Sequence, residues 1–241
     1  TTKFSHIRFA ASALSAERIR KMGEDSERIY RFGAPGVDEI VEGELIPKKK
    51  LYSKFNLAIS EPFLLLVQHA VTDEEDTVFA INETLKAIKL FKIRTIVIYP
   101  NSDAGGVKII NSYEVLKSEE HISLYPNLPR NNYLSLMKYA ACMVGNSSSG
   151  IIEAPSLKTG TVNIGNRQRG RVRAPSIIDC DASVESIRSG ISKLFSDKFR
   201  ASLKDVTNPH GGGNVSKKIT DVLRSYPLDD LLKKSFYDLP G

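Results

Sequence analysis

A run of small and hydroxyl-bearing residues at 145–155 has the composition of an anion-binding turn: Gly-Asn-Ser-Ser-Ser-Gly-Ile-Ile-Glu-Ala-Pro. It follows an apolar stretch at 140–144, which predicts a buried strand. At a turn from a strand into a helix, glycines let the backbone approach a ligand, free N–H groups of the helix point toward it, and serine hydroxyls add donors. We therefore expect an anion here, with Ser147 and Ser148 as its contacts and Gly150 as the point of close backbone approach.

Glu153 does not suit a plain phosphate site, because a carboxylate in the first turn of the helix repels a nearby anion. A ribose diol fits it better, since the diol offers two donors to one carboxylate. The alternative is a well-capped helix after a tight turn, because serine is a favoured residue at a helix N-cap. Three consecutive serines exceed what one cap requires.

Polar residues also follow three other expected strands. His69 lies at the carboxyl end of the strand expected at 63–68, where open parallel sheets bind ligands. On position alone, a ligand-binding histidine and a helix-capping histidine are equally supported. Asn101 follows the next strand and is also typical of an Asx turn. Arg167 is the first of four arginines within seven residues, and because charge runs usually form solvated surfaces we expect at most two of them to be functional.

The elements that must position these residues are short apolar or β-branched runs alternating with amphipathic stretches. This alternation predicts an α/β fold with βαβ units around a Rossmann-like parallel sheet. Strands are expected at 6–11, 29–32, 63–68, 95–99, 122–125, 142–145, 161–164 and 177–179. Helices are expected at 38–54, 73–91, 132–140, 184–195 and 215–223.

The composition excludes several classes of protein. The 241 residues are 41% hydrophobic and 26% charged, which is typical of a soluble globular protein and excludes disordered, collagenous and disulfide-rich classes. The net charge of +6 is modest, and no aromatic residues are interleaved with the arginines between 165 and 180, so nucleic-acid binding is disfavoured. The apolar runs are far shorter than the ~20 residues that span a membrane. Cys142 and Cys180 have no metal-ligand spacing, which favours reduced thiols in the cytoplasm, and we expect no metal and no redox cofactor.

The segment at 145–171 closely resembles the UDP-N-acetylglucosamine 2-epimerases, and most of all their hydrolysing branch. It carries the Asn-Ser-Ser-Ser loop together with Glu-Ala-Pro-Ser, Thr-Val-Asn-Ile-Gly and Arg-Gln-Arg-Gly-Arg. Further segments are similar to the same family in the same order, at 3–6, 33–36, 68–72, 99–103, 208–214 and 233–238. The resemblance implies a glycosyltransferase-B-like fold of two Rossmann-like domains, of which this chain is the C-terminal half. We expect 1–55 to be a remnant of the N-terminal domain, 56–225 the UDP-binding domain and 226–241 a tail.

The resemblance also implies a reaction and a set of site residues. UDP-N-acetylglucosamine loses UDP by elimination, and hydration then yields N-acetylmannosamine for sialic acid or related surface-sugar biosynthesis. His69 is the implied catalytic residue beside the leaving diphosphate, although Ala70 stands where the family usually has proline. Nucleotide contacts are implied for His69, Asn101, Ser147, Ser148, Gly150, Glu153 and Arg167. The implied partners are UDP or UDP-N-acetylglucosamine and, through the full-length protein, further copies in a homo-oligomer.

Acid–base catalysis in the family is assigned to carboxylates of the N-terminal domain, which this sequence lacks, so we expect this chain alone to be inactive. Two other interpretations remain open. One is a non-catalytic module that binds UDP-sugars. The other is half of a non-hydrolysing epimerase or of a glycosyltransferase, although the Asn-Ser-Ser-Ser loop favours the hydrolysing branch over the Ser-Gly-Gly type.

Overall fold

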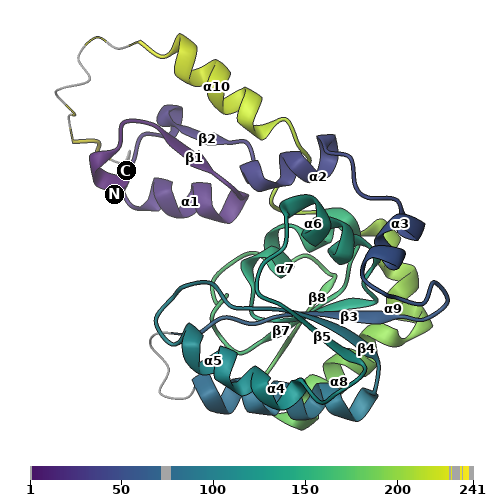
Figure 1. Cartoon of the computed structure of the whole chain (residues 1–241). Helices are drawn as coiled ribbons and strands as arrows, with labels where there is room; N and C mark the ends of the chain where they lie inside the picture. The colour runs from purple at the N-terminus through teal and green to yellow at the C-terminus, as the bar shows by residue number, and fades with distance from the viewer. Residues whose placement is uncertain (1, 72–76, 228, 230–233, 235, 239–241) are drawn as a thin grey trace. The chain divides into compact units, whose positions relative to one another are not determined.

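The computed structural model describes residues 2–71, 77–227, 229, 234 and 236–238. The chain forms two compact units. We call residues 44–207 the sheet unit and residues 1–43 together with 208–241 the small unit. Figure 1 shows the elements of each.

The sheet unit is built on six parallel strands in the order β5-β4-β3-β6-β7-β8. The strands are β3 (Phe63–Val67), β4 (Arg94–Ile98), β5 (Ile122–Tyr125), β6 (Cys142–Gly145), β7 (Thr161–Ile164) and β8 (Ile177–Cys180). Successive strands run outward from β3 to one edge and then, after a return across the sheet, from β6 to the other. The order therefore reverses between β3 and β6, which is the position where doubly wound sheets bind ligands.

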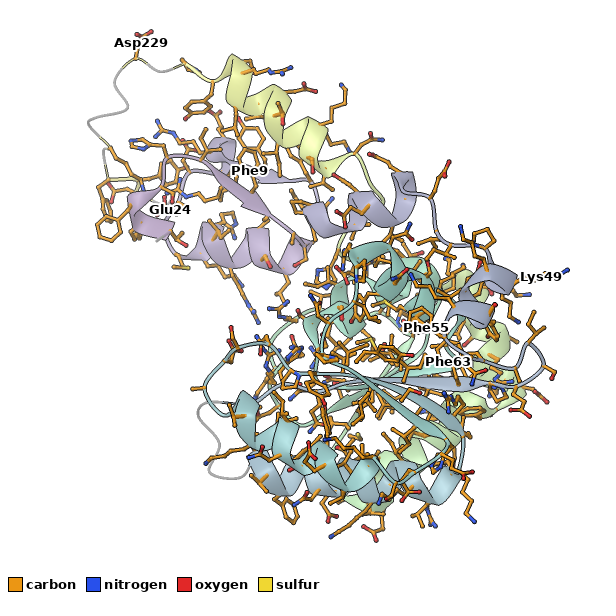
Figure 2. The ribbon with its side chains drawn as sticks, viewed as in Figure 1. Phe9, Glu24, Lys49, Phe55, Phe63 and Asp229 are labelled. Atoms are coloured by element: carbon orange, nitrogen blue, oxygen red, sulfur yellow. The ribbon has the colours of Figure 1, made fainter. Side chains whose placement is uncertain are left out.

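Helices cover both faces of this sheet. They are α3 (Lys48–Lys54), α4 (Thr77–Phe91), α5 (Gly106–Ser112), α6 (Arg130–Tyr139), α7 (Ser148–Ile152), α8 (Val184–Phe195) and α9 (Asp197–Ser202), with 3₁₀ turns at Tyr113–Leu116, Ala154–Leu157 and Leu203–Asp205. In Figure 1, α4, α5 and α8 lie on one side of the sheet, and α3 and α6 lie on the other. All five residues of β3 are buried because the strand is covered on both faces. Leu64 and Leu66 lie in the core with α4 and α8, whereas the Phe63 ring contacts Tyr52 of α3 (Figure 2).

The parallel α/β fold expected from sequence is confirmed, and the strand positions agree closely. β5, β6 and β7 have the expected bounds, and every other expected strand is present within one or two residues at each end. Helix α8 also has the expected bounds, and α6 begins two residues earlier than expected. Helix α4 is described from Thr77, and the expected start at 73 lies outside the described residues. Helices α1, α5 and α9 were not expected.

The continuous helix expected at 38–54 is wrong. The structure has α2 (Asp38–Glu42) and α3, separated by residues 43–47. Gly43 adopts an extended conformation, with φ −83° and ψ 151°. Pro47 also interrupts a helix, because it lacks a backbone N–H and disfavours helical geometry at the preceding residue.

The small unit combines two distant segments of the chain. Its elements are β1 (Arg8–Ala10), α1 (Ala13–Lys21), β2 (Ile29–Arg31), α2 and α10 (Val215–Ser225), with 3₁₀ turns at Thr2–Phe4, Ser26–Arg28 and Pro35–Val37, and β1 pairs in parallel with β2. The Ala34 N–H donates to the His210 carbonyl over 2.7 Å. The Asp38 carboxylate accepts from the N–H groups of Val215 and Ser216 over 2.9 and 2.7 Å and so caps α10. Burial acts to raise the pKa of Asp38, but these two hydrogen bonds outweigh it and the pKa is lowered.

The two compact units divide at 43/44 and 207/208. The domain boundaries expected from sequence, at 55 and 225, remain predictions. Helix α3 belongs to the sheet unit because the Tyr52 ring contacts both Phe63 and Tyr139. The Ile46 N–H also donates to the Ser135 hydroxyl over 2.9 Å. Helix α10 belongs to the small unit because Asp38 caps it.

A buried carboxylate attaches part of the C-terminal tail to the small unit. Glu24, labelled in Figure 2, has only 2% of its side chain exposed and forms ion pairs with Arg8, with Lys3 at 3.4 Å and with Lys234 at 3.0 Å. Lys234 also donates to the Lys3 carbonyl over 2.7 Å. Burial acts to raise the pKa of Glu24, but the hydrogen bond from Lys234 and the charge of Arg8 outweigh it, so the pKa is lowered.

We predict that Glu24→Gln lowers the free energy of unfolding by about 3 kcal/mol at pH 7, because it leaves the buried Arg8 guanidinium without its counter-ion. A carboxyl whose pKa is lowered by folding stabilises the protein above its unfolded pKa of about 4.3, and this stabilisation is lost as the pH falls through the folded pKa. The difference between wild type and variant should therefore shrink as the pH falls below about 4. Urea unfolding followed by circular dichroism at several pH values measures it. Exposed Glu27→Gln is the control, and equal stability of both variants at pH 7 would contradict the prediction.

Candidate functional site

The loops that leave β3, β4, β6 and β7 bring most of the expected site residues to one edge of the sheet. His69 follows β3, Asn101 follows β4, and Ser147 follows β6. Arg167 follows β7. Because β3 and β6 are neighbours at the point where the strand order reverses, these loops surround the crevice at the carboxyl ends of the strands.

Asn146 joins three of these loops. Its side-chain Oδ1 accepts from the His69 N–H over 2.7 Å, and its Nδ2 donates to the His69 carbonyl over 2.9 Å. Its own carbonyl accepts from Gln168 Nε2 over 2.8 Å and from Arg167 Nη1 over 3.3 Å. Asn146 is 3% exposed, so these hydrogen bonds are shielded from water. Sequence reasoning included Asn146 in the loop motif but gave it no role.

The preceding residue, Gly145, allows β3 and β6 to approach closely where the strands end. Its φ is +127°, and a Cβ atom added here would lie 2.1 Å from the Val67 carbonyl oxygen. No side chain fits that space. Gly145 therefore fixes the position from which Asn146 reaches His69.

The His69 ring is held as a hydrogen-bond donor. Its Nδ1 accepts from the Asn101 N–H over 3.1 Å, so this partner assigns the proton of the neutral ring to Nε2. Burial lowers the pKa of His69, and the nearby positive charge of Arg167 lowers it further. At neutral pH the ring is therefore uncharged and presents Nε2–H.

Arg167 supplies a fixed positive charge beside this ring. Its guanidinium contacts the Asn146 carbonyl and lies 3.5 Å from an Asp103 carboxylate oxygen. Asp103 also accepts from the Asn101 side-chain amide over 2.7 Å. Asp103 thus links Asn101 to Arg167.

Of the other three arginines of the run, one stabilises the loop and two are exposed to solvent. The Arg173 guanidinium bonds to Asp179 and donates to the carbonyls of Gln168 and Arg171 over 2.8 and 2.7 Å, so it holds the loop. Arg169 and Arg171 are exposed. Arg167 is therefore the arginine of the run that the structure places against His69 and Asn146.

The serines lie at the beginning of α7. Ser147 is its N-cap and accepts from the Ser149 N–H over 3.4 Å, as the capping alternative expects. Ser148 is half-buried, and its hydroxyl has no partner among the described residues. The Gly150 N–H donates to the Ser147 carbonyl, and a Cβ at Gly150 would lie 2.7 Å from Thr161 Cγ2. The close approach that Gly150 permits is thus between α7 and β7.

Glu153 is engaged by an arginine that sequence reasoning missed. Arg130, the first residue of α6, donates to both Glu153 carboxylate oxygens, over 2.6 and 3.2 Å. Each carboxylate oxygen has a second lone pair, so Glu153 retains acceptor capacity for a ligand hydroxyl. No local sequence signal indicates this pair, because the two residues are 23 positions apart and meet only where α6 packs beside the 3₁₀ turn that follows α7.

A small cavity lies behind these loops. Its volume is about 20 Å³, enough for about one water molecule, and it is lined by residues that include Gln68, His69, Asn146 and Gly165. Gln68 Oε1 is buried there without a partner among the described residues. This cavity is therefore too small to hold a nucleotide.

The side chains at this edge of the sheet are mainly hydrogen-bond donors. The His69 Nε2–H, the Arg167 guanidinium and the serine hydroxyls all donate hydrogen bonds, and Glu153 adds one acceptor group. Such a set suits a ligand with a negatively charged part and a hydroxyl-bearing part. Within the described residues, no three His, Cys, Asp or Glu side chains gather as metal ligands, and no helix is long and apolar enough to cross a membrane.

The strand order defines a doubly wound α/β protein, and its candidate site lies where the strand order reverses. Sequence comparison then identifies the family. The sequence model of the UDP-N-acetylglucosamine 2-epimerase family matches residues 1–224, and the chain belongs to that family.

Relatives and a solved structure agree with this assignment. The chain is 31% identical to the UDP-N,N'-diacetylbacillosamine 2-epimerase (hydrolyzing) of Legionella pneumophila, over 94% of this chain and 59% of the relative. It is 33% identical to the GDP/UDP-N,N'-diacetylbacillosamine 2-epimerase (hydrolyzing) of Campylobacter jejuni, over 99% and 63%. The structure of the UDP-GlcNAc 2-epimerase of Neisseria meningitidis bound to UDP-GlcNAc matches with a TM-score of 0.78 at 17% identity, over 93% of this chain and 62% of that one. The chain thus spans about three fifths of the length of these proteins.

We predict that the His69 imidazole titrates below the ordinary histidine pKa of about 6.5 and carries its proton on Nε2 when neutral. Arg167→Ala should raise the His69 pKa, because it removes a nearby positive charge. Exposed Arg169→Ala should leave it unchanged. Side-chain ¹⁵N NMR across pH 4–9, assigned with His69→Gln, measures both the pKa and the tautomer. A proton on Nδ1 would contradict the geometry.

Proposed function

We propose that this chain is the UDP-binding part of a hydrolysing 2-epimerase that converts UDP-N-acetylglucosamine to N-acetylmannosamine and UDP. The observation that carries the proposal is the meeting of His69, Arg167 and the α7 serines at the reversal of strand order. The diphosphate is bound by the donors of His69, Arg167, Ser147 and Ser148, and the ribose hydroxyls by Glu153. The Asn101 backbone N–H orients the His69 ring by donating to Nδ1, and Asn101 lies beside the nucleotide.

The proposed reaction begins with removal of the proton at C2 of the sugar and anti elimination of UDP, which gives a 2-acetamidoglucal. Water then adds at C1, and C2 is reprotonated from the opposite face. Negative charge develops on the departing diphosphate, where Arg167 supplies a fixed positive charge and His69 a hydrogen bond from Nε2. As this charge develops, the His69 pKa rises and the hydrogen bond strengthens. The groups that exchange the C2 proton belong to the part of the family fold that lies outside these 241 residues.

A second candidate substrate is UDP-N,N'-diacetylbacillosamine. Two relatives at 31% and 33% identity carry this sugar in their names, whereas the matching structure from Neisseria meningitidis holds UDP-GlcNAc. Both substrates share the UDP group, to which the residues described here are assigned. A nucleotide-sugar substrate and free Cys142 and Cys180 fit a location in the cytoplasm.

We predict that the chain binds UDP and that His69→Gln, Arg167→Ala and Ser148→Ala each weaken binding. The loss should be about tenfold or more for Arg167, because hydrogen bonds to charged groups contribute about 1.5–3 kcal/mol. Isothermal titration calorimetry measures the affinity, and Arg169→Ala, which changes an exposed arginine two residues further along, should alter it less than twofold. Unchanged affinity in all three site variants would show that UDP binds elsewhere. The same sample should release no N-acetylmannosamine from UDP-N-acetylglucosamine.

We predict that Glu153 gives the chain a preference for UDP over 2′-deoxy-UDP of about tenfold, because the deoxynucleotide lacks a hydroxyl that donates to the carboxylate. Glu153→Gln should weaken UDP binding and reduce this preference to about twofold, while affecting 2′-deoxy-UDP much less. Competition titrations with the two nucleotides measure the preference. Glu185→Gln, on the exposed first turn of α8, is the matched control. An equal preference in wild type and Glu153→Gln would remove Glu153 from the ribose site.

A further inference from the structure

Three hydroxyl groups from two helices form a continuous chain that ends at the proposed diphosphate site. The Tyr133 hydroxyl of α6 is hydrogen-bonded to the Ser149 hydroxyl of α7. The Ser149 hydroxyl is in turn hydrogen-bonded to the Ser147 hydroxyl over 2.8 Å. None of the functional assignments above uses Tyr133 or Ser149.

Which hydroxyl donates in each of these two hydrogen bonds depends on the number of protons and lone pairs available. Each hydroxyl has one proton to donate and two lone pairs that accept. Burial raises the pKa of Tyr133 to about 12, so its hydroxyl stays protonated at neutral pH and needs an acceptor. Ser149 Oγ provides that acceptor. If the hydrogen bond between Tyr133 and Ser149 ran the other way, the proton of the half-buried Tyr133 hydroxyl would lose this acceptor.

With Tyr133 donating to Ser149, the Ser149 hydroxyl keeps its proton and one lone pair for Ser147, and it donates that proton whenever Ser147 donates its own to a ligand. In that arrangement Ser147 Oγ also accepts from the Ser149 N–H, so both of its lone pairs are used. Its own proton therefore remains for an acceptor outside the chain. Donors in such a series polarise one another, which strengthens the final hydrogen bond.

We propose that Tyr133 is a positioning residue that, through Ser149, fixes the Ser147 hydroxyl as a donor to the phosphate group of a nucleoside diphosphate. The inference rests on the proposed function, because it assumes that the diphosphate lies at the beginning of α7. The inference gives the three hydroxyls a role in discriminating between ligands. Ser147 favours a ligand that brings a negatively charged oxygen and disfavours one that brings a further hydrogen-bond donor.

The test compares UDP with uridine, which has the same nucleoside and no phosphate. Tyr133→Phe removes one oxygen and keeps the ring, and it should weaken UDP binding about three- to tenfold. Uridine binding should change less than twofold. The Tyr133→Phe/Ser147→Ala double variant should bind UDP no more weakly than Ser147→Ala alone, because Tyr133 acts only through Ser147. Tyr139→Phe, on the same helix, is the matched control and should bind both ligands as wild type does.

Calorimetry of UDP and ligand-observed NMR of uridine give the affinities, and circular dichroism verifies that each variant is folded. If Tyr133→Phe does not fold, Ser149→Ala interrupts the same chain and should give the same pattern. Equal weakening of UDP and uridine, or additive losses in the double variant, would overturn the inference while leaving the UDP site in place. A wild-type chain that does not bind UDP would overturn both proposals.

Discussion

The paired hydrogen bonds between the Asn146 side chain and the backbone of His69 are the constraint on which the rest of the site depends. Strands β3 and β6 lie side by side because their backbones pair, but that pairing ends at Gly145. Beyond it the two loops are held together by one primary amide, which satisfies a donor and an acceptor of His69 at once. An unpaired amide at this depth costs more than either hydrogen bond contributes, so the arrangement is strongly specified.

Asn146 also sets the electrostatics of the site. Its backbone carbonyl, which is separate from the side-chain amide, accepts from Gln168 and Arg167. Arg167 lies close enough to lower the His69 pKa, so beside this permanent cation the imidazole is a neutral donor instead of a second cation. A neutral donor whose hydrogen bond strengthens as negative charge develops responds to charge on the ligand, whereas a permanent cation binds substrate and leaving group alike.

The sequence predicted the fold well because the strands of a parallel sheet with helices on both faces are short, continuous apolar runs. Such runs can be recognised in the sequence without tertiary information. Phe63–Val67 is an example. The single helix expected at 38–54 was wrong because the amphipathic pattern was given more weight than Gly43 and Pro47. The loop positions of His69, Asn101, Ser147 and Arg167 could be predicted from the ends of strands, and their nucleotide contacts remain predictions. The Arg130–Glu153 ion pair, the Tyr133–Ser149 hydrogen bond and the packing role of Gly150 could not, because each depends on how one helix lies against a neighbouring element.

The cap that Asp38 places on α10 has a consequence for how the chain folds. The carboxylate and the N–H of Val215 are 177 positions apart, so the small unit closes a loop that contains the whole sheet unit. The entropic cost of closing a loop grows with the length of its flexible part. The sheet unit is contiguous in sequence, and once it has folded the flexible length to be closed falls to a few residues at each end. The small unit is therefore expected to assemble after the sheet unit has folded.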